Sequence, residues 1–218
     1  MNFRGAFLLV LLPLLAACDH TTDMAEVEAM QTQMTPTVAS YEAMSFTKLS
    51  YPASEPVSVT AETPVFDFGG DGRSHVVALE IPQRSDVITI DIRTDSAFPC
   101  RNCAMRTFFP KVVLLDADKK PLASPMLQGP FYTYGENGAY LFRHVWLDVA
   151  PAMRAHYAVI YTTRSLIAAG EEAVYGGPGV AMAGPLFIPI GGQRAAVKGS
   201  PTGKILIVLR TPGPPVTE

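Results

Sequence analysis

The stretch Asp86–Asp95, DVITIDIRTD, decides the fold predicted for this chain. Isoleucines recur at every second position and the residues between them are mostly polar, which is the pattern of a β-strand with one buried face. One face carries Ile88, Ile90 and Ile92, and the other carries Val87, Thr89 and Asp91. The stretch therefore predicts a half-buried strand.

Further stretches with strand patterns lie on both sides of it, at Val65–Phe68, His75–Pro82, Lys111–Leu115, Pro130–Tyr134, Gly138–Val149, His156–Thr163 and Gly203–Arg210. The glycines of GGDGR suit a hairpin turn between the first two, and the continuous apolar run Lys111–Leu115 predicts a central strand. Helical periodicity is weak outside Asp23–Met34 and a short stretch capped by Thr163. We expect an all-β fold: a jelly-roll-like antiparallel β-sandwich with at most one or two short helices.

The N-terminus has the pattern of a bacterial export signal. Arg4 precedes the apolar run Ala6–Leu15, which is too short to span a bilayer because a span needs about 20 apolar residues. The residues LAAC that end at Cys18 resemble a lipobox, although an ordinary signal with an incidental cysteine is the alternative. We expect residues 1–17 to be a lipoprotein signal peptide and acyl chains on Cys18 to anchor a periplasmic protein. Asp19 favours the inner membrane over the outer one.

The remaining length suits one domain with its own core. Residues 18–50 are rich in Thr, Met, Ala and Glu, so we expect a lipid anchor and flexible tether there. The β-sandwich is expected over residues 51–211 and a disordered tail over 212–218. The net charge is -3 with no basic run, which excludes nucleic acid as the expected partner.

Cys100 and Cys103 remain as a pair in PCRNCAMR. In an oxidising periplasm such a pair predicts a local disulfide. A thioredoxin-like redox centre is the alternative, but it requires the pair at the start of a helix. The Gly- and Pro-rich stretch 170–201 is either a functional loop or a flexible excursion.

No pattern typical of a hydrolase, a phosphate-binding loop or a calcium site is found, and we expect no catalytic residues, metal or cofactor. The histidines His75, His144 and His156 fall on separate predicted strands, where they are more typical of structural residues than of metal ligands. Asp116 and Asp118 lie beside two lysines and suit a hairpin turn better than a carboxylate pair.

The most suggestive pattern is aromatic. A strand with period two places Tyr140, Phe142, His144, Trp146 and Asp148 on one face of Gly138–Val149. These rings either fill the core of the sandwich or, if their face is solvated, stack on sugar rings. The candidate carbohydrate contacts are Tyr134, Tyr140, Phe142 and Trp146.

The series FFPKVVLLDADKKP, FYTY, HYAVIYTTRSL and SPTGKILIVL, between Phe66 and Leu209, resembles the maltose operon periplasmic protein family in order and spacing. The resemblance implies a non-enzymatic accessory of maltose and maltodextrin uptake, with maltooligosaccharides or a transport component as partners. The lipobox and the CRNC segment depart from the family pattern. The alternative function is an envelope structural or assembly lipoprotein that binds a protein partner. A thiol redox or metal-dependent enzyme is a distant third.

Overall fold

The computed structural model describes residues 22–96, 105–134, 141–175, 179–183, 186–190 and 193–213. Within these ranges the helices are α1 (Met24–Gln33) and α2 (Arg164–Ala168), and two 3-10 turns are η1 (Gly69–Asp71) and η2 (Pro151–Met153). No helix in the described ranges is long and apolar enough to cross a bilayer. Cys18, Cys100, Cys103 and Tyr140 lie outside the described residues, so the roles proposed for them stay predictions.

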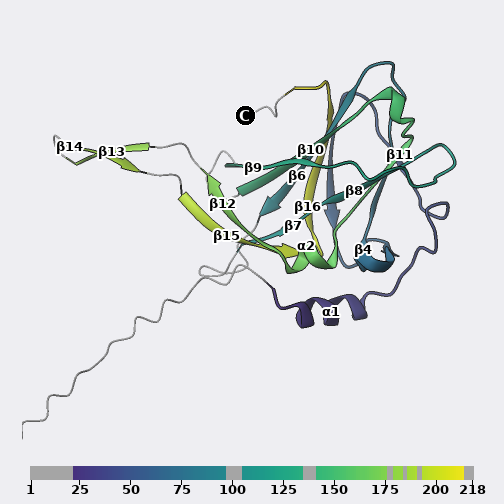
Figure 1. Ribbon diagram of the computed structural model, residues 1–218, viewed down its shortest axis with the longest axis horizontal. Coiled ribbons are helices and arrows are strands. Elements are labelled where there is room, and N and C mark those ends of the chain that lie inside the picture. Colours follow the sequence, from purple (N-terminus) through teal and green to yellow (C-terminus); the bar gives the residue numbers. More distant parts are fainter. Residues whose placement is uncertain are drawn as a thin grey trace, which may run out of the picture.

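Two sheets form the body of the molecule (Figure 1). Sheet A has the order β1-β5-β11-β8, made of β1 (Thr47–Lys48), β5 (Val77–Glu80), β11 (Tyr157–Tyr161) and β8 (Lys111–Leu115). Sheet B has the order β2-β16-β6-β10-β9, made of β2 (Ala53–Val59), β16 (Gly203–Arg210), β6 (Ile88–Ser96), β10 (Leu141–Val149) and β9 (Gln128–Tyr134). Neighbouring strands are antiparallel except β1 and β5, which are parallel.

The chain crosses between the sheets repeatedly, from β1 to β2, from β5 to β6, from β8 to β9 and from β10 to β11. Such crossings bring strands that are distant in sequence into one sheet. The all-β antiparallel sandwich is confirmed, and its repeated crossings agree with a jelly-roll-like arrangement.

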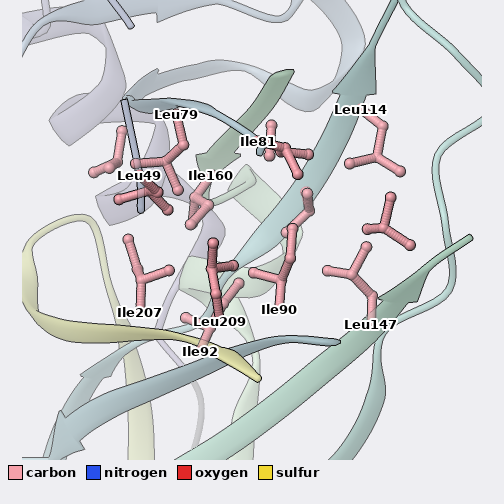
Figure 2. Close-up of a cluster of buried hydrophobic side chains, with 14 of the residues drawn as sticks. Leu49, Leu79, Ile81, Ile90, Ile92, Leu114, Leu147, Ile160, Ile207 and Leu209 are labelled. Carbon is pink, nitrogen blue, oxygen red and sulfur yellow. The ribbon is translucent and has the colours of Figure 1, made fainter. Parts of the chain in front are cut away.

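The main core lies between the two sheets (Figure 2). The isoleucines of β6 point into it and are almost fully buried, with Ile92 0% exposed. Sheet A contributes Leu79, Leu114 and Ile160, and sheet B adds Leu147, Ile207 and Leu209. Burial of aliphatic side chains stabilises by about 1.5–3 kcal/mol each, which makes this layer the dominant favourable contribution to the fold.

The N-terminal segment covers the other face of sheet A. Val113, Leu115 and Val159 are buried there against Met44, with Tyr41 and Phe46 packed around them. The backbone amides of Thr37 and Val38 donate to the carbonyl of Val65, which fixes the segment at the start of β3 (Val65–Asp67). Sheet A is therefore covered on both faces.

The expectation of a flexible tether up to residue 50 is wrong for the part of it that the structure describes. Val27 of α1 is 0% exposed, and Met44 and Leu49 are buried in the two cores. Few apolar residues occur in this segment, so its composition resembles a linker, but Leu49 and Met44 each join a core and Val27 is fully buried. Thr22, the first residue that the structure describes, is already buried.

The position of β8 in sheet A differs from the prediction. The apolar run Lys111–Leu115 predicted a central strand, whereas β8 is the last strand of sheet A. Val112 and Leu114 face the core between the sheets, and Val113 and Leu115 face the core under the N-terminal segment. The run is apolar because both faces of the sheet are covered, and this does not require a neighbour on each side.

A third sheet, of order β12-β15-β7, is made of β12 (Gly170–Tyr175), β15 (Gln193–Ser200) and β7 (Met105–Phe108). Strands β13 (Gly179–Ala183) and β14 (Leu186–Ile190) pair as a hairpin that extends away from the body (Figure 1). The described parts of the Gly- and Pro-rich stretch, predicted as a loop, are thus mostly paired strands.

Local signals in the sequence are confirmed at three places. Strands β3 (Val65–Asp67) and β4 (Arg73–His75) form the hairpin predicted around GGDGR, where Gly69 and Gly72 have positive φ. Helix α2 is capped by the Thr163 hydroxyl, which accepts from the amide of Leu166 at 3.1 Å. Asp116 accepts from two backbone amides in a turn, as expected.

A substitution at Leu49 tests whether the N-terminal segment belongs to the folded domain. Leu49→Ala is expected to lower the free energy of unfolding by about 2–5 kcal/mol, because it leaves a cavity in the main core. Urea denaturation measures this change. Met24→Ala, at a side chain that is 45% exposed, is the matched control and is expected to have little effect. A Leu49→Ala protein as stable as the control would mean that the segment is a tether after all.

Candidate functional site

The outer face of sheet B is the candidate site. In β10, the residues with odd numbers are buried, while Phe142, Trp146 and Asp148 are partly exposed. Register pairs Trp146 with Asp91, His144 with Arg93 and His144 with Phe131. Directly paired residues of neighbouring strands share a face. The strands β6, β10 and β9 therefore bring aromatic, acidic and basic side chains together on the face that is turned away from the main core.

The aromatic rings on this face pack against each other. Phe131 stacks on the His144 ring with centroids 4.4 Å apart and meets Trp146 edge-on at 5.7 Å. The guanidinium of Arg93 lies over the Phe142 ring at 4.1 Å. These contacts hold the rings in fixed orientations, so a ligand that stacks on them loses less entropy than one that must order them.

Gly129 brings β9 close to the aromatic cluster. Its φ is +100°, and an added Cβ would lie 2.8 Å from the backbone oxygen of His144 and 3.2 Å from the Trp146 ring. The β9–β10 register shifts between His144 and Trp146 at the same place. A bulge of this kind re-aims neighbouring side chains. Glycine is required here so that the first residues of β9 can lie against Trp146.

A pair of charged side chains lies beside the rings. Asp91 Oδ2 accepts from Arg210 Nε at 3.3 Å, and Asp91 Oδ1 is 3.9 Å from His144 Nδ1. Asp91 Oδ1 and Arg210 Nη2 are buried and have no hydrogen-bond partner among the described residues. Unsatisfied polar atoms are costly in a protein interior, so each of these atoms has unused hydrogen-bonding capacity beneath the aromatic face.

Polar groups of neighbouring residues complete the face. Asp148 accepts a 2.5 Å hydrogen bond from the hydroxyl of Thr89, and His144 Nε2 lies 2.8 Å from the Thr133 hydroxyl. Gln128 is exposed at the start of β9. Flat rings with hydroxyl, amide and carboxylate groups around them can stack on the apolar face of a sugar ring and bond its hydroxyls.

Two of the candidate carbohydrate contacts, Phe142 and Trp146, lie on this face, so the alternative that they fill the core is wrong. Tyr134 ends β9, where it pairs with Leu141, and its side chain lies outside the described residues, as Tyr140 does. Asp91, Arg93 and Arg210 were not predicted as site residues. The alternation in DVITIDIRTD already placed Asp91 opposite the isoleucines, but only the strand register brings it beside Trp146.

The three histidines are not brought together. His75 Nδ1 lies 2.8 Å from the carbonyl of Thr63, His144 belongs to the aromatic face, and His156 precedes β11. Among the described residues no group of three or more His, Cys, Asp or Glu side chains could hold a metal ion.

A polar cleft of about 440 Å³ lies elsewhere, between α1, the β3–β4 hairpin and α2. Arg73 lies in it but is already paired with Asp67 and the carbonyl of Met34, and Arg164 donates to the carbonyl of Gly70. Its cations are used by the protein itself, so the cleft is a weaker candidate than the face of sheet B.

A buried cluster ties sheet B to the third sheet. Arg143 donates two hydrogen bonds to Glu171, at 2.9 and 2.8 Å, and Tyr132 donates a third at 2.5 Å. Burial raises the pKa of Tyr132, and the neighbouring Glu171 raises it further. Burial alone would raise the pKa of Glu171, but the hydrogen bonds and charge of Arg143 lower it below the ordinary 4.5.

In comparisons with protein-family models, curated proteins and solved structures, nothing matches this chain. The site is therefore judged on its own geometry, and the family resemblance stays a prediction.

Removing both members of the Asp91–Arg210 pair should lower the free energy of unfolding by less than the sum of the two single removals. Asp91→Ala and Arg210→Met are each expected to lose about 3–5 kcal/mol of unfolding free energy, because a charge is left buried without its partner. The double variant should lose clearly less than the sum of the two, as measured by a double-mutant cycle in urea. Additive losses would show that the two side chains are not coupled.

The Arg143–Glu171 pair predicts a pH dependence of stability. The pKa of Glu171 is lowered in the folded protein, so its stabilising contribution is complete above the ordinary value of 4.5 and is lost as the pH falls through the lower folded value. The stability difference between the protein and Glu171→Gln should therefore be largest near pH 6 and shrink below pH 4.5. Glu55→Gln, at an exposed position of β2, is the control. A difference that stays constant from pH 6 to acid would contradict the ion pair.

Proposed function

We propose that this protein is a non-enzymatic, lipid-anchored periplasmic accessory of carbohydrate uptake that binds oligosaccharides on the outer face of sheet B. The observation that supports this best is the position of Phe131, Phe142 and Trp146. They lie on a partly exposed sheet face, although aromatic side chains in a sandwich usually serve the core.

The sheet arrangement supports the choice of this face. Sheet A is buried on both sides, since the N-terminal segment covers the side that faces away from the core. On the outer face of sheet B, Trp146 and Phe142 of β10 stay partly exposed, although Asp91 and His144 beside them are buried. Rings that are already oriented by Arg93 and by one another are suited to stacking on a sugar.

The charges of the face favour a neutral ligand. Asp91, Asp95 and Asp148 lie near Arg93 and Arg210, so neither sign dominates. A neutral saccharide with many hydroxyl groups can use carboxylate and guanidinium groups together, because each hydroxyl both donates and accepts. Maltooligosaccharides, which the family resemblance implies, belong to this class.

Titration of the acyl-free protein with maltooligosaccharides tests the proposal. Trp146 is the single tryptophan, so its fluorescence should change saturably if a sugar stacks on this face. Phe131→Ala should weaken the affinity about tenfold, which is about 1.4 kcal/mol. Tyr51→Ala, which removes a partly buried aromatic ring that packs under Arg84, is the matched control and should leave the affinity unchanged.

Calorimetry on the same samples detects binding that fluorescence misses. No signal up to millimolar ligand by either method would reject sugar binding on this face. The alternative, an envelope lipoprotein that binds a protein partner, would then be favoured, and pull-down from envelope extracts with the face intact or altered by Trp146→Ala would test it.

A further inference from the structure

The structure fixes the N-terminal segment to the body much closer to Cys18 than its composition indicates. The amide of Thr22 donates to the carbonyl of Ala168 at the end of α2, at 3.1 Å. Val27 in α1 is 0% exposed, and the side-chain Nε2 of Gln31 donates to the backbone carbonyl of Arg73 at 3.0 Å. From Thr22 onward, the chain is therefore held against α2 and the β3–β4 hairpin.

This docking sets the distance between the lipid anchor and the domain. From Cys18 to Thr22 an extended chain spans at most about 14 Å. A free tether reaching residue 50 would span up to about 110 Å. If Cys18 carries acyl chains, the domain cannot stand away from the bilayer, and the end that contains Thr22 and Ala168 is the end nearest to it.

The composition of this end agrees with contact with lipid of low charge. Met24 follows the docked residue by two positions and is 45% exposed, one of the few large apolar side chains exposed in the described part of the chain. Helix α1 also carries exposed Glu26 and Glu28 and contains no Lys or Arg. Helix α2 has one cation, Arg164, which donates to the Gly70 carbonyl, so the two helices together stay acidic. Anionic headgroups would be repelled by these carboxylates, whereas zwitterionic headgroups would not.

We propose that the α1–α2 end of the domain is seated directly on a zwitterionic phospholipid surface, with Met24 reaching the headgroup layer. The seating rests on the lipid anchor of the proposed function but not on sugar binding. Strand β11 runs from η2 to α2, so Met153 of η2 lies at the opposite end of that strand and faces away from the bilayer.

Single-tryptophan reporters in the full acylated chain test the seating. Trp146→Phe is combined with Met24→Trp in one protein and with Met153→Trp in its matched control, since Met24 and Met153 are similarly exposed, at 45% and 43%. Both are placed in phosphatidylcholine vesicles, with and without brominated acyl chains. The Met24→Trp emission is expected to fall by about half, because a seated side chain lies within the 5–10 Å boundary that these chains reach. The Met153→Trp emission should not change.

A flexible insert provides the second arm. About 20 Gly and Ser residues placed between Thr21 and Thr22 add about 25 Å of root-mean-square reach and should abolish the quenching at Met24→Trp. Three results would overturn the seating: no quenching at Met24→Trp before the insertion, quenching there that the insertion does not change, or equal quenching at the two reporters.

Flotation with the vesicles is measured on the same samples, and acylated protein that fails to float would overturn the lipid anchor itself. Vesicles with added phosphatidylglycerol should weaken the quenching at Met24→Trp, and stronger quenching there would contradict the role of the acidic helix.

Discussion

The burial of one face of β6 against sheet A is the interaction on which the rest of the structure depends. Ile88, Ile90 and Ile92 fill the centre of the layer between the sheets, where aliphatic residues of β5, β11 and β16 meet them. Because side chains alternate strictly along a strand, fixing the isoleucines inward also fixes Asp91 and Arg93 outward. The same packing that stabilises the sandwich therefore positions the polar half of the candidate site.

Much of the fold could be predicted from local patterns. Period-two alternation, the GGDGR turn and the Thr163 cap depend on neighbours in sequence, and the structure has all three. The packing of residues 22–49 could not be predicted, because Val27, Met44 and Leu49 are isolated apolar residues in a polar segment. Nothing in their surroundings forms a periodic pattern, and only the completed sheets provide the surfaces that bury Met44 and Leu49.

The candidate site was predictable only in part, for a related reason. Phe142 and Trp146 stand on one strand, so alternation alone groups them. The salt bridge between Asp91 and Arg210 joins residues 119 positions apart, and it exists because β16 pairs with β6. No single-strand pattern contains that pairing. Aromatic periodicity also has the same form whether a face is buried or solvated, and the N-terminal segment, by covering sheet A and not sheet B, makes the difference.

The pairing of β2 with β16 has a consequence for how the protein reaches its native state. Ala53 pairs with Leu209, so β2 cannot form its sheet pairing until β16, near the C-terminus, has been delivered. One edge of β6 also stays unpaired until β16 is present. A chain that is delivered from its N-terminus thus spends most of its delivery with these aliphatic strands unpaired, a state prone to aggregation. Holdase chaperones would protect such a chain during that interval, and closure of the sheet by β16 would end the need for them.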